Sequence, residues 1–149
     1  MAIITADVLI KGKKREEIFE WLGDFTNHAR ILTEAFPVVE SKGETQLSLG
    51  YGPIFRQRRI GYIFEGKDND HGGRRINVRT EGKRTSGHLN FSLRTMKPAS
   101  NTMVTLHWDY NTGGLIGEAI NSQWMRKELQ ERIEKTLENL QTQLTANPG

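Results

Sequence analysis

The chain has 149 residues, the size of one ordinary domain and large enough to bury a substantial core. Its 36% hydrophobic and 26% charged residues are typical of a soluble globular protein. The sequence contains no cysteine, which excludes disulfides and thiolate chemistry and favours a cytoplasmic location. The net charge of +3 is too small an excess to predict a nucleic-acid partner.

Membrane-spanning and targeting segments are not expected. No apolar run approaches the roughly 18 residues of a membrane span. The start, MAIITADVLI, alternates and lacks the basic and apolar blocks of a secretion signal. The run KGKKR at 11–15 is read as a solvated turn, with contact to a membrane surface as the alternative. We find no repeat, low-complexity tract or linker, so residues 1–149 are predicted to form a single domain.

The first predicted elements are a strand and two helices. Residues 2–10 alternate in polarity, which predicts a strand with its even positions toward the core. From Glu16 the apolar residues recur at helical spacing. They are Ile18, Phe19, Leu22 and Phe25. A second, short helix is predicted over 28–34 and must end before Pro37, which cannot donate to a helix ladder.

The middle of the chain reads as strands joined by turns. Alternating segments predict strands over 36–42, 45–50, 54–65, 74–81, 86–96 and 102–111. Successive strands with short connections favour an antiparallel meander that has one wet face.

The last predicted element is a long amphipathic helix. Its apolar stripe consists of Ile116, Ile120, Trp124, Leu129, Ile133, Leu137, Leu140 and Leu144. A helix over about 116–144 would be roughly 40 Å long. Such a helix depends on packing, and the concave side of the sheet is the apolar surface available for it. We expect the turns after about Leu137 to extend beyond the sheet.

Three arginines interrupt the strand that reads IFRQRRIGYIF at 54–64. Alternation places Arg56 and Arg58 on the same face as the richer apolar set, which contains Ile60 and Tyr62. If that face is interior, the guanidinium groups need water or an anionic partner, for which carboxylate or phosphate is suited. The alternative is a bulge near Gly61 or after the preceding Gly-Pro, which would reverse the faces.

Aromatic and apolar side chains are the other candidates for a ligand site. With the two arginines, we predict a pocket lined by Tyr62, Phe91, Trp108, Tyr110, Ile120 and Trp124. A filled core is the alternative for each of them.

No catalytic residue, metal site or cofactor is predicted. The histidines lack metal-ligand spacing; they are His28, His71, His88 and His107. Asp24 and Asp109 have no evident acid–base partner, and a helix cap and a solvated strand position are their simpler roles. Nucleophile motifs, phosphate loops and dinucleotide fingerprints do not occur.

The order of elements resembles a known superfamily. The stretches that carry the resemblance are ADVLIKGKKREEIFEWLGDFTNHARI, VTLHWDYNTGGLIGEAI and the closing amphipathic helix. They are similar to the START-like superfamily, also called SRPBCC or the polyketide cyclase/dehydrase and lipid-transport group. The resemblance implies an α+β helix-grip fold: a curved seven-stranded antiparallel sheet wrapped around a long C-terminal helix, with two short helices between the first two strands.

The same resemblance implies binding or transport of a hydrophobic small molecule, such as a lipid, quinone or aromatic acid, in a cavity between sheet and helix. An inward pair of arginines would make that ligand acidic. The alternatives are a cyclase or dehydratase using the same cavity, and an interaction module of the Hsp90-activator kind. Arginines without a catalytic acid or base favour binding over catalysis, and the polar outer strand faces count against the interaction module. A monomer and a homodimer both stay open.

Overall fold

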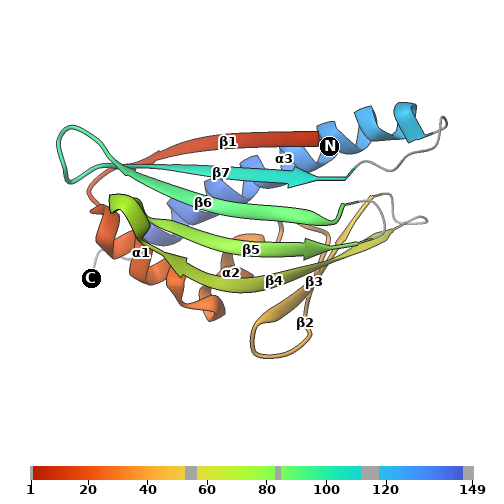
Figure 1. The fold of residues 1–149 in the computed structure, drawn as a ribbon, viewed down its shortest axis with the longest axis horizontal. Helices are drawn as coiled ribbons and strands as arrows, with labels where there is room; N and C mark the ends of the chain where they lie inside the picture. The colour runs from red at the N-terminus through yellow and green to blue at the C-terminus, as the bar shows by residue number, and fades with distance from the viewer. Residues whose placement is uncertain (1, 53–56, 83–84, 112–117, 146–149) are drawn as a thin grey trace.

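The computed structural model describes residues 2–52, 57–82, 85–111 and 118–145 (Figure 1). A seven-stranded antiparallel sheet has the order β1-β7-β6-β5-β4-β3-β2. The strands are β1 (Ala2–Ile10), β2 (Val38–Ser41), β3 (Gln46–Tyr51), β4 (Arg58–Asp68), β5 (Arg75–Glu81), β6 (Gly87–Thr95) and β7 (Thr102–Tyr110). The predicted meander is therefore confirmed.

Helices cover one face of this sheet. Between β1 and β2 lie α1 (Arg15–Gly23), the 3-10 helix η1 (Phe25–Asn27) and α2 (His28–Leu32). A second 3-10 helix, η3 (Asp70–Gly72), joins β4 to β5, and α3 (Glu118–Thr145) follows β7. Figure 1 shows α3 running across the sheet, with α1 and α2 near its C-terminal end. This arrangement is the predicted helix-grip fold. None of the described helices is long and apolar enough to cross a membrane.

The core lies between α3 and the concave face of the sheet. In β1 the even positions Ala2, Ile4 and Ile10 are buried, whereas Ile3 is 48% exposed, which confirms the predicted phase of this strand. On α3 the buried stripe consists of Met125, Leu129, Ile133, Leu137, Leu140 and Leu144.

Two expectations about α3 are wrong. Trp124 does not belong to the buried stripe: it is 56% exposed, and Met125 takes the inward position. The reason is geometric, since 124 to 129 is five residues, which at 3.6 residues per turn leaves the two side chains on different faces. The turns after Leu137 do not overhang either, because Leu140 and Leu144 are buried against the rest of the fold.

Polar side chains of α3 also bind the main chain of β1. Arg126 Nη2 donates to the Ile3 carbonyl at 3.2 Å, and Gln130 Nε2 donates to the Thr5 carbonyl at 2.8 Å. Further along, Gln141 Nε2 donates to the Leu9 carbonyl at 3.0 Å. The helix is thus fixed to the sheet by hydrogen bonds along its length as well as by its apolar stripe.

The register of β4 decides which way Arg58 faces. Pairing with β3 runs without a shift from Arg58, opposite Tyr51, to Ile63. The irregularity in β4 lies between Phe64 and Gly66, beyond the stretch in question. Arg58 is therefore on the concave face with the buried Ile60 and Tyr62. Arg56 lies outside the described residues.

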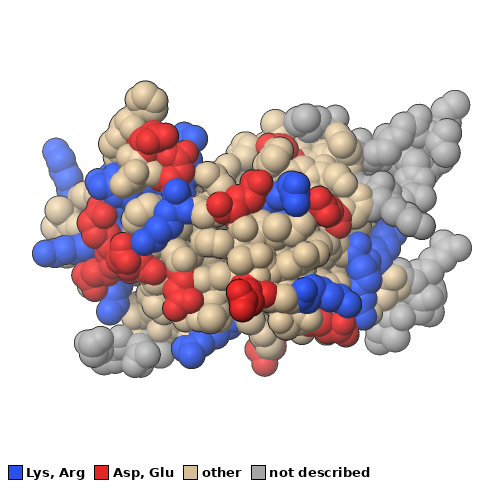
Figure 2. All heavy atoms as spheres, turned by 60° about the horizontal axis from the view of Figure 1, so that its bottom comes forward, with Lys and Arg blue, Asp and Glu red and all other residues tan. Residues whose placement is uncertain are grey.

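Several charged side chains on the outside form ion pairs. Glu16 on α1 lies 3.3 Å from Arg15 and 3.1 Å from Arg74, and Lys67 lies 2.8 Å from Glu20. The face in Figure 2 carries interspersed basic and acidic groups. Such a face gives no broad field of one sign with which to attract a nucleic acid.

Candidate functional site

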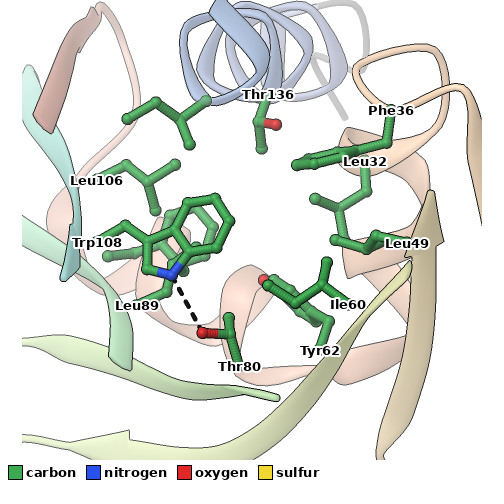
Figure 3. Close-up of a pocket in the computed structure, with 12 residues that line it drawn as sticks. Leu32, Phe36, Leu49, Ile60, Tyr62, Thr80, Leu89, Leu106, Trp108 and Thr136 are labelled. Atoms are coloured by element: carbon green, nitrogen blue, oxygen red, sulfur yellow. Dashed lines mark hydrogen bonds between the residues drawn. The ribbon is translucent and has the colours of Figure 1, made fainter. Parts of the chain in front are cut away.

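An apolar cavity lies between the sheet and α3 (Figure 3). It is lined by Leu32, Phe36, Leu49, Ile60, Tyr62, Thr80, Leu89, Phe91, Leu106, Trp108, Ile133 and Thr136. The space between atoms inside this lining is about 310 Å³. Most of it consists of gaps too narrow for a water molecule, because the centre of a water-sized sphere can occupy only about 10 Å³. That is room for about one water molecule. The cavity is therefore nearly filled by its own side chains.

The polar groups of Trp108 and Thr80 in this lining are satisfied within the protein. Trp108 Nε1 donates to Thr80 Oγ1 at 3.1 Å (Figure 3), and that hydroxyl donates to the Thr85 carbonyl at 2.9 Å. Thr136 Oγ1 donates back to the Arg132 carbonyl at 2.8 Å. The cavity consequently offers mainly apolar surface to anything that enters it.

A buried histidine supports one wall of the cavity. Tyr62 Oη lies 2.7 Å from His28 Nδ1, and His28 Nε2 lies 2.7 Å from the Leu22 carbonyl oxygen. A carbonyl can only accept, so Nε2 carries the proton, while Nδ1 accepts from the tyrosine. Burial lowers the pKa of His28 to about 4 and raises the pKa of Tyr62. Both groups are therefore neutral near pH 7.

Aromatic rings enclose this histidine. The His28 ring lies 5.5 Å from the rings of Phe25 and Phe64 and 5.8 Å from that of Phe91. His28 was not predicted as a site residue, because the four histidines lack metal-ligand spacing and no other role was assigned to them. A usable signal was present: His28 follows Phe25 by three residues, which continues the apolar face of the preceding helix.

Three polar side chains lie on the concave face near the first described turns of α3. Tyr51 Oη lies 3.8 Å from Met125 Sδ, and Arg58 Nη1 lies 3.7 Å from the same sulfur. Tyr110 is fully buried, its ring lies 5.4 Å from that of Trp108, and its hydroxyl has no hydrogen-bond partner among the described residues. We call Tyr51, Arg58 and Tyr110 the donor cluster.

The predicted site residues lie in three different places: the cavity, the donor cluster and a surface groove. Tyr62, Phe91 and Trp108 line the cavity. Arg58 and Tyr110 belong to the donor cluster. Trp124 lies instead on a surface groove with Gly52, Lys127, Glu128, Glu131 and Arg132. Arg56 and the side chain of Ile120 lie outside the described part of the chain.

Glu128 and Arg132 connect α3 to two loops. Glu128 Oε1 accepts from the Gly52 amide at 2.8 Å and from Arg132 Nη2 at 3.3 Å. Arg132 Nη1 donates to the Ala35 carbonyl at 3.2 Å. These bonds hold the end of β3 and the segment before β2 against the helix, at the rim of the cavity.

The two aspartates considered as acids or bases have other contacts. Asp24 Oδ1 accepts from Thr26 at both the amide, 3.0 Å away, and the hydroxyl, 2.7 Å away, so it caps η1. These bonds to Thr26 lower the pKa of Asp24. Asp109 Oδ1 accepts from the His88 amide at 3.3 Å on the other side of the sheet from Trp108 and Tyr110. Neither carboxylate is among the residues that line the cavity.

Solved structures share this architecture. TTHA0849 from Thermus thermophilus is 17% identical and has a TM-score of 0.73, over 99% of this chain and 100% of that one. The Zhui aromatase/cyclase from Streptomyces sp. R1128 is 14% identical with a TM-score of 0.58, over 95% and 89%. A START superfamily protein from Mycobacterium smegmatis is 14% identical with a TM-score of 0.50, over 93% and 98%.

No model of a protein family and no curated protein matches the sequence. At identities this low, structural likeness establishes the fold and not the activity. The resemblance drawn from the order of the elements is confirmed at that level: the chain has the helix-grip fold of START-like, or SRPBCC, proteins.

Proposed function

We propose that this protein binds or transports a hydrophobic small molecule in the space between the sheet and α3. The observation that carries the proposal is the apolar cavity, whose Trp108 and Thr80 are already hydrogen-bonded to each other. Ligand sites are typically concave and largely apolar, with few polar groups. The solved structures with this fold include an aromatase/cyclase, which supports a small organic ligand as the occupant.

Binding must enlarge the cavity, because its present free space holds about one water molecule. Ligand cavities usually have volumes of about 300–1,000 Å³. Some lining residues belong to α3 and others to the segment around Phe36. Glu128 joins α3 to the end of β3, and Arg132 joins α3 to the segment before β2. We expect a ligand to displace side chains there, while the sheet keeps its register.

Binding is favoured over catalysis by the hydrogen bonds of the titratable pair. Tyr62 donates its proton to His28, and His28 donates its own to the Leu22 carbonyl. The proton of Tyr62 and both ring nitrogens of His28 are thus engaged, so neither residue offers the cavity the proton or basic nitrogen of a general acid or base. Tyr62 is the titratable residue in the described lining, and burial raises its pKa, so it does not supply the general base that a cyclase or dehydratase would need near pH 7.

The test uses N-phenyl-1-naphthylamine, a neutral apolar probe whose fluorescence rises in apolar surroundings. We expect saturable binding to the wild-type protein. Leu106→Trp should reduce it at least tenfold by filling the cavity, whereas His107→Trp, with the same ring on the opposite face of β7, should not change it.

A second measurement does not depend on the folding of the filled variant. With Trp21 and Trp124 both replaced by phenylalanine, Trp108 is the remaining tryptophan. Bound probe should then quench Trp108 by energy transfer. Binding that is not saturable, or that leaves Trp108 emission unchanged, would contradict the proposal.

A further inference from the structure

The donor cluster lies beyond the residues that line the cavity, toward one end of the sheet. Each of its members lies two residues beyond a cavity-lining residue on the same strand, these being Leu49, Ile60 and Trp108. Because side chains two apart in a strand share a face, all three point to the concave side. The ends of β3 and β7 and the start of β4 lie at the same end of the sheet, near the start of α3 (Figure 1).

Among the described residues, a sulfur is the acceptor for the donors of both Tyr51 and Arg58. Both converge on Met125 Sδ, at 3.8 Å and 3.7 Å. A thioether sulfur is a weak acceptor, and a guanidinium group matches carboxylate or similar oxyanions best. Arg58 takes part in none of the ion pairs formed among the described residues.

Tyr110 adds a third donor to the cluster. It is 0% exposed, and its hydroxyl has no hydrogen-bond partner in the described part of the chain. Burial raises the pKa of Tyr110, so the hydroxyl keeps its proton. Buried polar groups in native proteins rarely stay unpaired.

Glu128, an acidic residue on the described part of α3, forms its ion pair with Arg132 and not with Arg58. Glu128 lies almost one turn after Met125, but its Oε1 is bound to the Gly52 amide and to Arg132 Nη2. Its Oε2 is buried and has no partner among the described residues. Among the described residues, the guanidinium of Arg58 and the hydroxyl of Tyr51 thus share one sulfur, and the hydroxyl of Tyr110 has no acceptor.

We propose that the donor cluster binds the compact oxyanion head of an amphipathic acid whose apolar body occupies the cavity. This inference rests on the proposed function and specifies its ligand class. The guanidinium of Arg58 supplies charge-assisted hydrogen bonds, and the hydroxyls of Tyr51 and Tyr110 donate to the remaining oxygen atoms. A neutral molecule with the same body would leave these donors unmatched and bind more weakly.

The experiment compares two probes that share one apolar body. 1-Anilinonaphthalene-8-sulfonate carries a sulfonate, and N-phenyl-1-naphthylamine lacks it. We expect the wild-type protein to bind the sulfonate at least tenfold more tightly. Arg58→Met should weaken sulfonate binding roughly ten- to a hundredfold, as expected for a lost charge-assisted hydrogen bond, and change the neutral probe less than twofold.

Arg59→Met is the matched control, because Arg59 follows on the same strand, faces outward and lies 3.5 Å from Glu40. It should alter neither probe. Tyr110→Phe gives an independent readout: it should weaken sulfonate binding about three- to tenfold without lowering the melting temperature of the free protein, since the hydroxyl has no hydrogen-bond partner among the described residues. Competition by dodecanoate or by 1-naphthoate distinguishes a fatty acid from an aromatic acid.

The two proposals can fail separately. If the neutral probe binds but the sulfonate is no tighter, or if Arg58→Met and Arg59→Met weaken sulfonate binding equally, the head-group inference is wrong and the cavity proposal stands. If neither probe binds, the proposed function itself fails.

Discussion

Acidification should destabilise this protein through one buried side chain, His28. The ring lies among Phe25, Phe64 and Phe91, and both of its nitrogens are engaged, by Tyr62 and by the Leu22 carbonyl. Protonating Nδ1 would bury a charge and would turn the acceptor of the Tyr62 proton into a donor. The folded state therefore resists protonation.

The magnitude follows from the two pKa values. Burial lowers the pKa of His28 from 6.5 to about 4 in the folded protein, and the bond to Leu22 and the charge of Asp24 oppose this only in part. The unfolded chain takes up the proton first, so stability is complete above pH 6.5 and falls as the pH drops toward 4. At about 1.36 kcal/mol for each pH unit, the full loss is about 3 kcal/mol, of which roughly 2 kcal/mol is lost by pH 5.

The assay is urea denaturation at 25 °C and at pH 7, 6 and 5. His28→Gln is the comparison, because an amide can accept from Tyr62 and donate to Leu22 but does not titrate. The wild-type protein should lose about 2 kcal/mol more than His28→Gln between pH 7 and 5. His107→Gln, on the other face of the sheet, should behave like wild type. Equal losses in wild type and His28→Gln, or an NMR pKa of 6 or above for His28, would refute the reasoning.

Two further predictions concern packing. Met125→Ala should lower the free energy of unfolding in urea by about 2–5 kcal/mol, because it leaves a cavity in the core. Trp124→Ala should change it by no more than about 0.5 kcal/mol, because this side chain is exposed. The reverse order would show that Trp124 belongs to the buried stripe. A Cβ at Gly87 would overlap the Asp109 carbonyl oxygen, whereas one at Gly61 would make contacts of 3.4 Å or more. Gly87→Ala should therefore lower the stability by about 1–3 kcal/mol and Gly61→Ala by clearly less, and similar thermal shifts for the two would count against this close approach.

The sheet and its topology could be predicted from the sequence because burial on one face imposes alternation. In β7 every second residue from Thr102 to Tyr110 is buried, as the pattern indicates. The direction of Arg58 followed from the same rule, once a bulge near Gly61 could be excluded. That exclusion needed the structure, because nothing in the sequence distinguishes a glycine at a bulge from one that pairs regularly, as Gly61 does with Ser48 and Glu81.

Two features could not be predicted from the sequence: which face of α3 turns inward at its start, and what His28 contacts. Trp124 lies four residues after Ile120, whereas Met125 lies four residues before Leu129, so the two halves of the helix favour different inward positions. His28 meets Tyr62 across 34 positions, and its role depends on a neighbour that no local pattern names. The free volume of the cavity depends on how side chains such as Phe36 and Trp108 pack together, which residue types alone do not determine.

The hydrogen bonds from α3 to β1 have a consequence for self-association. β1 is an outermost strand, and its unpaired carbonyls could template another chain. Those of Ile3, Thr5 and Leu9 are occupied by Arg126, Gln130 and Gln141. The polar residues of the helix thus protect this border of the sheet against strand addition. The opposite border is β2, only four residues long, so neither side presents a long open edge on which an aggregate could grow.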